Sequence, residues 1–343
     1  MKEWLASVLQ GMPYAQAFVH GAIIITFIQV SVLLLIYMER KVAGFIQSRV
    51  GPMRTGPYGS LQTLADAIKL MTKEDIVPAA ADRFLFLLAP FMVLLPTFLV
   101  FSVLPFAESW LVQEFSAALI FIVGASTMAI TGIIMAGWGT NNKYSLLGGM
   151  RSAAQLISYE IPIVLALLCV AFYAGSMNTV EIVTAQQGVR YLFGIPLPNW
   201  FILHPPLMLA ALIYYIGQLA ETNRTPFDLP EAESELVSGF HTEYSGMRFA
   251  FFFLAEFANT FFAAALGIVL FFGGWDGLGG NWGALWFLTK SYVGVFFLMW
   301  IRWTLPRVRI DQLLGFAWKV LVPLGLFAVL WTAAAVVFGG KVR

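Results

Sequence analysis

The chain has 343 residues, of which 59% are hydrophobic and only 11% are charged, and its formal net charge is +1. Soluble domains usually have about a quarter of their residues charged, so this composition excludes a water-soluble fold and indicates a protein largely surrounded by lipid. The small net charge argues against nucleic acid as a partner. The single cysteine excludes a disulfide within the chain and an iron–sulfur cluster held by this chain alone.

Apolar stretches long enough to cross a bilayer recur along the whole chain. A membrane-spanning helix needs about 20 mostly apolar residues. Eight stretches qualify, and in chain order they are 19–38, 84–105, 115–138, 156–175, 203–220, 249–273, 284–304 and 317–338. The first runs into Glu39-Arg40-Lys41 rather than a small-residue cleavage site, which indicates a permanent span. The predicted fold is all-α, a single polytopic membrane domain over residues 1–343 with about eight transmembrane helices.

Basic residues mark one side of the membrane. They gather in the loops after the odd-numbered spans, at Arg40, Lys41, Arg49, Arg54, Lys69, Lys73, Arg83, Lys143, Arg151, Arg224, Arg248, Arg302, Arg307, Arg309 and Lys319. The opposite side has only Lys2, Arg190, Lys341 and Arg343. By the positive-inside rule the basic loops face the cytoplasm. Both termini are therefore predicted on the outer, periplasmic side of a bacterial inner membrane, or in the inner mitochondrial membrane if the chain is organellar.

The first inside loop, residues 39–83, contains a predicted amphipathic helix. A segment rich in glycine and proline, residues 51–57, precedes it. Apolar residues then follow at helical spacing, at Leu61, Leu64, Ala65, Ile68 and Met71, while Asp66, Lys69 and Lys73 lie off this stripe. Such a helix is expected to lie in the membrane interface. Packing of the stripe on the protein's own surface fits the periodicity equally well.

The second inside loop, residues 221–248, is strongly acidic. Its acidic residues are Glu221, Asp228, Glu231, Glu233, Glu235 and Glu243, against two arginines. A plain solvated loop accounts for one or two such acids. Six of them beside a membrane favour a site that uses titratable groups.

Three ionisable residues stand inside predicted spans, Glu160, Glu256 and Lys290. A charge at the bilayer centre costs roughly 2.5–3.5 kcal/mol or more, so such residues are candidates for function. Lys290 lies close to the outer boundary, where snorkelling explains it. Snorkelling is also an equal alternative for Glu39, Arg40 and Arg302 at span ends. Buried carboxyl groups suit a proton relay, which leaves a proton-coupled carrier and a subunit of a larger proton-moving assembly both open.

Other chemistries find no support in the spacing of residues. The three histidines, His20, His204 and His241, are not placed to face one another across a bundle, so neither haem nor a metal site is expected. The glycine-rich run 273–280 follows no strand, and we interpret it as a tight turn rather than a dinucleotide fingerprint. No nucleophile–base arrangement is evident.

Three stretches of the chain carry distinctive motifs. The first runs from Glu39-Arg40-Lys41 through Gln47-Ser48-Arg49-Val50-Gly51-Pro52 to Thr72-Lys73-Glu74. The second is Ala220-Glu221-Thr222-Asn223-Arg224-Thr225-Pro226-Phe227-Asp228-Leu229 and its continuation to Glu243-Tyr244. The third is Arg302 with Pro306-Arg307 and Arg309-Ile310-Asp311-Gln312-Leu313.

With these motifs the chain resembles, over essentially its whole length, the family of H-type membrane subunits of proton-translocating NADH:quinone oxidoreductase (respiratory complex I). The mitochondrial members of this family are the chain 1 proteins of NADH–ubiquinone oxidoreductase. Met53 and Thr63 depart from the Asn and Pro more usual in the family.

The resemblance implies three groups of site residues. Around a quinone cavity it places Arg40, Asp66, Phe227 and Arg302. In a proton-coupling path it places Glu39, Glu160, Glu221, Asp228, Glu231, Glu233, Glu235 and Glu256. For ion pairing or docking of partner subunits it places Arg224, Glu243, Arg307 and Arg309.

The resemblance also implies what the chain works with. It is expected to act as a subunit of an enzyme that couples quinone reduction to proton translocation, with no NADH site or redox centre of its own. Quinone is the expected substrate, and FMN and iron–sulfur clusters are expected on partner subunits. The expected partners are the peripheral-arm subunits of the quinone site, small membrane-arm subunits and lipid. A proton-coupled transporter, the membrane anchor of a related hydrogenase and a purely structural anchor are the alternatives, and the acidic loop with Glu39-Arg40-Lys41 favours the quinone enzyme.

Overall fold

The computed structural model describes residues 13–108, 111, 114–192, 195–229, 236–277 and 282–338. The elements up to the middle of the chain are α2 (Pro13–Ile46), η1 (Pro57–Gly59), α3 (Gln62–Thr72), α4 (Arg83–Phe101), α5 (Ala118–Gly139), α6 (Lys143–Ala174) and α7 (Thr179–Ala185). Then follow β1 (Val189–Leu192), β2 (Ile195–Pro198), η2 (Phe201–Leu203), α8 (Pro205–Glu221), η3 (Gly239–His241), α10 (Gly246–Phe271), α11 (Gly283–Thr304), α12 (Ile310–Phe316), the π-helical η5 (Ala317–Leu321) and α13 (Val322–Phe338).

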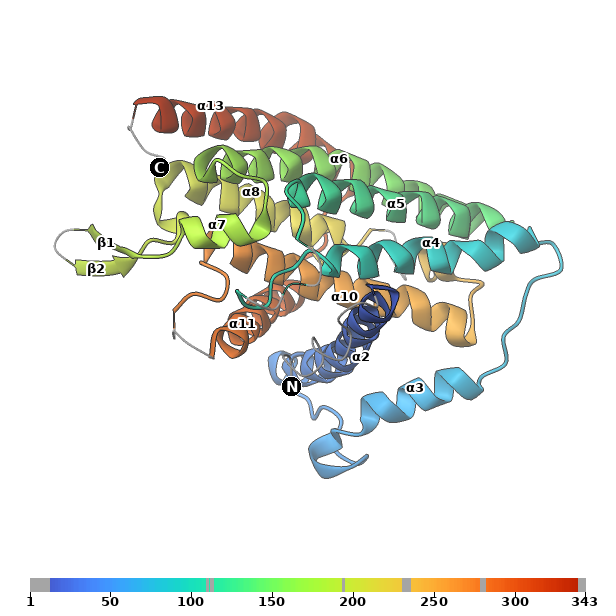
Figure 1. The fold of residues 1–343 in the computed structure, drawn as a ribbon. Coiled ribbons are helices and arrows are strands. Elements are labelled where there is room, and N and C mark those ends of the chain that lie inside the picture. The colour runs from blue at the N-terminus through green and yellow to red at the C-terminus, as the bar shows by residue number, and fades with distance from the viewer. Residues whose placement is uncertain are drawn as a thin grey trace.

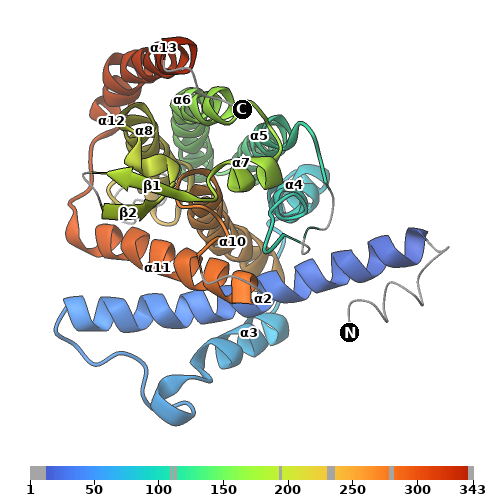
Figure 2. The same cartoon turned by 60° about the vertical axis from the view of Figure 1, so that its left-hand side comes forward.

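The long helices form two groups that are strongly inclined to each other. In Figure 1, α13, α6, α5 and α4 run side by side, with α8 and α10 beneath them. Figure 2 shows α2 and α11 lengthwise where α4, α5, α6 and α13 are seen nearly end-on. The helix α10 joins the groups, because it packs on α4 and α8 on one side and on α2 and α11 on the other. The core therefore lies around α10.

Helices occupy all eight predicted spans. Within the described residues, seven helices are at least 18 residues long and apolar enough to cross a bilayer. The eighth predicted span, 203–220, corresponds to α8, which has 17 residues and so lies at the short end of the range for a spanning helix. The chain is an all-α multi-pass membrane protein, with one small addition that the apolar runs do not predict. Strands β1 and β2 pair antiparallel as a hairpin on the outer side of the predicted topology.

Two helices extend further than the apolar runs predict. Helix α2 continues through Glu39-Arg40-Lys41 to Ile46, because the charged side chains are held by partners within the protein; Lys41, for example, donates to the Pro52 carbonyl at 2.7 Å. Helix α6 begins at Lys143 rather than near residue 156. Asn142 caps it by accepting a hydrogen bond from the Tyr144 amide at 2.9 Å.

The helix predicted in the first inside loop is α3, and its apolar stripe is exposed. Leu61, Leu64, Ile68 and Met71 are each about half exposed or more, whereas Thr63 on the opposite face is buried. Figures 1 and 2 show α3 at the edge of the bundle, beside α2. This arrangement favours the interfacial position over packing on the protein's own surface.

Lys290, which is predicted to snorkel, binds carbonyl groups just beyond the outer end of α10. Its ammonium group donates to the carbonyl oxygens of Phe272 at 2.8 Å and Asp276 at 3.2 Å. It also lies 5.4 Å from the ring centre of Trp200 and 5.7 Å from that of Trp286. The charge is thus held by carbonyl dipoles and aromatic faces, which gives it a structural role.

Glycines permit the closest approach between the acidic loop and α6. A Cβ atom on Gly148 would lie 2.7 Å from the Cα of Gly239 and 2.8 Å from the Phe240 amide nitrogen. The Ser145 hydroxyl also donates to the Phe240 carbonyl at 2.8 Å. Residues 239–240 are therefore seated against the inside half of α6.

We expect Gly148→Ala to destabilise the protein. Alanine improves helix propensity by up to about 1 kcal/mol, but its methyl group meets backbone atoms that cannot turn away, and overpacking of this kind costs about 1–3 kcal/mol. Gly124→Ala in α5 is the matched control, since nothing lies within 4 Å of a Cβ there. Thermal unfolding of both variants in the same detergent tests this expectation. A Gly148→Ala protein as stable as the Gly124→Ala protein would contradict it.

Candidate functional site

The carboxylate of Glu39 is the centre of a buried ion-pair cluster. Consecutive residues on a helix point about 100° apart, so Glu39 faces the bundle while Arg40 faces α3. One Glu39 oxygen pairs with Arg302 of α11. The other accepts from Arg224, just after α8, at 2.7 Å. The Glu39 side chain is only 9% exposed, which rules out snorkelling for this residue.

Arg224 connects Glu39 to a second carboxylate. Its side chain is 2% exposed, and its second terminal nitrogen lies 3.3 Å from Glu256 of α10. The guanidinium also stacks 4.5 Å from the ring centre of Phe257. Two carboxylates and two guanidinium groups thus balance in charge within an apolar core, as buried charges require.

A more open pair lies on the other side of α2. Arg40 and Asp66 of α3 form a salt bridge at 2.5 Å, with side chains 42% and 26% exposed. Gln62 donates to the second Asp66 oxygen at 3.1 Å and accepts from Thr55 at 2.8 Å. This network fixes α3 against the inside end of α2 and forms a polar rim there.

Phe227 ties the start of the acidic loop to α6. Gln155 of α6, fully buried, donates to the carbonyls of Ala220 and Phe227, both at 2.8 Å. The Phe227 ring lies 5.4 Å from that of Tyr159, and the Tyr159 hydroxyl donates to the Leu313 carbonyl at 3.0 Å. The last two contacts hold Tyr159, which directly precedes Glu160 in the chain.

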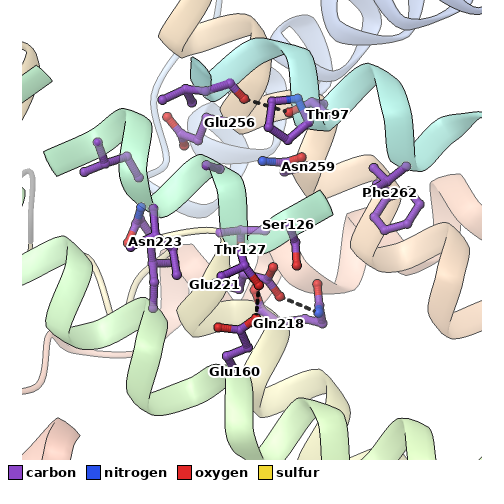
Figure 3. A pocket seen from close by; sticks show the side chains of 18 of the residues that line it. Thr97, Ser126, Thr127, Glu160, Gln218, Glu221, Asn223, Glu256, Asn259 and Phe262 are labelled. Carbon is purple, nitrogen blue, oxygen red and sulfur yellow. Dashed lines mark hydrogen bonds between the residues drawn. The ribbon is translucent and has the colours of Figure 1, made fainter. Parts of the chain in front are cut away.

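A cavity of about 100 Å³ lies between α4, α5, α6, α8 and α10 (Figure 3). Its wall includes three predicted carboxyl groups, Glu160, Glu221 and Glu256, together with His241. Glu160 accepts from the Thr127 hydroxyl, and Glu221 accepts from the Gln218 amide at 2.7 Å. One water needs roughly 10–15 Å³ on this measure and several polar partners, so the cavity has room for a short chain of waters between these groups.

The remaining predicted residues lie around this site. Asp228 pairs with Arg307 at 3.2 Å, and Glu243 accepts from Asn142 at 2.6 Å. Arg309 is 78% exposed and pairs with Asp311, at 3.0 Å. Glu231, Glu233 and Glu235 lie outside the described residues.

The four residues predicted around a quinone cavity lie outside the wall of this cavity. Arg40, Asp66, Phe227 and Arg302 do not line it. Of these, Arg302 is joined to it through the ion pairs of Glu39, Arg224 and Glu256. Arg40 and Asp66 form their own pair on the other side of α2.

Sequence reasoning misses Gln155, Thr127, Asn142 and His241 as parts of the site. For Gln155, the available signal in the sequence is a side-chain amide beside an apolar run, which indicates a buried hydrogen-bonding group. The available signal for His241 is its position in the acidic loop, two residues before Glu243. The spacing of the three histidines tests this residue only as a haem or metal ligand. Thr127 and Asn142 give no signal, because single small polar residues are common at any depth.

Comparison with known proteins gives a consistent result. A family model described as NADH dehydrogenase matches residues 19–333. A relative from Geobacillus kaustophilus, named as the H subunit of NADH-quinone oxidoreductase, is 49% identical over 337 residues, covering 97% of this chain and 98% of the relative. Relatives of the same name from Bacteroides fragilis, at 46% identity over 95% of this chain and 92% of the relative, and from Chlorobaculum tepidum, at 46% over 88% and 87%, are also similar.

We expect Arg224→Met to lower the stability of the protein by about 3–5 kcal/mol, because removing one partner leaves buried charge uncompensated. Arg309→Met, the same chemical change at an exposed arginine, is the control and should have little effect. The measurement is the unfolding temperature of each purified protein. Equal unfolding temperatures for the two variants would show that the buried cluster does not contribute to stability.

Proposed function

The chain belongs to the NADH dehydrogenase family, and from that premise we propose that, as a membrane subunit of NADH-quinone oxidoreductase, it forms part of the quinone cavity and couples quinone reduction to proton translocation. One observation carries this proposal. A continuous series of ion pairs leads from Arg302, through Glu39 and Arg224, to Glu256, which lines a cavity that contains two further carboxyl groups.

The proposed quinone end of this series comprises Arg302 and the polar rim. Arg40, Asp66 and Arg302 supply charged and hydrogen-bonding groups for a headgroup, and the exposed apolar stripe of α3 suits a hydrophobic tail. The rim is open on one side, since the Arg40 side chain is 42% exposed. A peripheral-arm subunit that carries the reducing chemistry would close it, and this is the partner that we propose on the inside face.

The cavity is the proposed proton end. Reduction of quinone to quinol takes up two electrons and two protons, so negative charge appears at the rim until protons arrive. That charge draws Arg302 away from Glu39. Glu39 then holds Arg224 more strongly, because it has lost its other cation.

The consequence reaches Glu256. As Arg224 moves toward Glu39, its charge stabilises the ionised form of Glu256 less, and Glu256 takes up a proton. The proton is then available to Glu221 and Glu160 through water in the cavity. Return of Arg302 when the quinol is neutral resets the cluster, so each reduction drives one cycle of proton uptake and release.

Orientation and docking follow from the same arrangement. The acidic loop, the rim and the basic residues all lie at the inside ends of the helices, so we propose that they face the cytoplasm of a bacterial cell and that both termini face the periplasm. Arg309 lies apart from the buried cluster and is highly exposed. It is placed to bind an acidic surface of a partner subunit.

The coupling role predicts a specific defect for Glu160→Gln. Turnover from NADH to quinone and proton pumping should both fall by at least about tenfold, because an amide cannot exchange protons as a carboxyl group does. NADH oxidation by artificial acceptors should be intact, since the redox centres lie on other subunits. Glu181→Gln, at an exposed position of α7, is the matched control. Normal pumping in the Glu160→Gln complex would rule out the proposed path.

The quinone role predicts covalent labelling at the rim. A photoreactive quinone analogue should label peptides from α2, α3 or α11 when the complete complex is illuminated, and excess natural quinone should suppress the label. Mass spectrometry of the digested protein identifies the peptide. If no competable label is found on this chain, a purely structural anchor becomes the better assignment.

A further inference from the structure

His241 is a partly buried titratable residue that the coupling cycle above does not use. It ends η3, in the wall of the cavity that Glu160, Glu221 and Glu256 share. Its imidazole packs between two aromatic rings, with ring-centre distances of 4.9 Å to Phe240 and 5.4 Å to Phe249. A wholly apolar side chain would fill this aromatic site without the cost of burying a polar ring.

The backbone that carries His241 is held in place. The Ser145 hydroxyl binds the carbonyl of the preceding residue, Phe240, at 2.8 Å. Gly239 lies against Gly148 so closely that no side chain fits between them. The turn that carries the imidazole is therefore held against α6 beside the cavity.

Two carboxylates act electrostatically on the imidazole. Glu256 belongs to α10 and lines the cavity, and Asp228 belongs to the acidic loop, where it pairs with Arg307. Both favour the protonated ring electrostatically, yet burial outweighs them and lowers the pKa of His241 to about 4. The ring is thus neutral near pH 7, with one nitrogen that donates and one that accepts.

We infer that His241 carries protons between the inside face at Asp228 and the cavity carboxyl group of Glu256, on the coupling path proposed above. The neutral imidazole accepts a proton on one ring nitrogen and releases the proton held by the other to Glu256. The ring returns to its neutral form as the other tautomer, so no net charge stays behind. Exchange with water in the cavity, which has room for several molecules, restores the first tautomer.

The test uses the complete complex with His241→Asn and His241→Phe. Asparagine keeps a polar side chain but cannot exchange protons in this way, and phenylalanine keeps the aromatic packing. His204→Asn is the matched control, because it makes the same change at a histidine that does not line the cavity. Each complex is assayed for NADH oxidation by ferricyanide, for NADH-to-quinone turnover and pumping, and for the solvent isotope effect on quinone turnover.

The inference predicts that both His241 variants keep ferricyanide activity but lose at least about tenfold of quinone turnover and pumping. It also predicts a larger solvent isotope effect than in the parent, because proton delivery becomes rate-limiting, while His204→Asn keeps the parent's isotope effect. Unchanged turnover in His241→Asn, or a lower rate with an unchanged isotope effect, would overturn it. Glu160→Gln is measured in the same assay. A defect there with normal His241→Asn turnover would reject the relay alone, whereas normal turnover in both would reject the coupling path as well.

Discussion

The carboxylate of Glu39, shared between two guanidinium groups, is the interaction on which the inside half of this protein depends. In a medium of low dielectric constant each of these charges is tolerated only because the others are close. The sharing ties together α2, α10, α11 and the segment after α8 at one point. It also explains why α2 continues as a helix past the apolar run, since Glu39 is neutralised there rather than directed to solvent.

The same cluster is well suited to switching because its anions and cations compete. Glu39 has two cations, and Arg224 has two carboxylates. Any field that favours one pair weakens its neighbour, so in the proposed cycle a charge near Arg302 acts on Glu256 through the ion pairs alone. Two other carboxyl groups of the cavity have neutral partners, since Glu160 accepts from Thr127 and Glu221 accepts from Gln218.

The sequence predicts the helices well and the connections between functional residues poorly. Apolar runs locate the spans because lipid allows few polar residues, and a charge in such a run, as at Glu160 or Glu256, is conspicuous for the same reason. The partners of Glu39 could not be predicted, since Arg224 and Arg302 stand 185 and 263 residues further along the chain. Gln155 escapes prediction because an amide in an apolar run does not reveal that it binds the carbonyl groups of Ala220 in α8 and Phe227 in the acidic loop.

The length of α6 has a mechanical consequence. Its 32 residues make a rod about 48 Å long at 1.5 Å per residue, which exceeds the roughly 30 Å of hydrocarbon in a bilayer. The helix therefore extends beyond the bilayer, and Ser145 and Gly148 on the projecting part contact the acidic loop. Glu160 lies within the membrane on the same helix. A small twist applied to the projecting end would rotate Glu160 relative to Thr127. Torsion of a single helix thus offers a route from the water-exposed loop to the membrane interior that needs no diffusing ion.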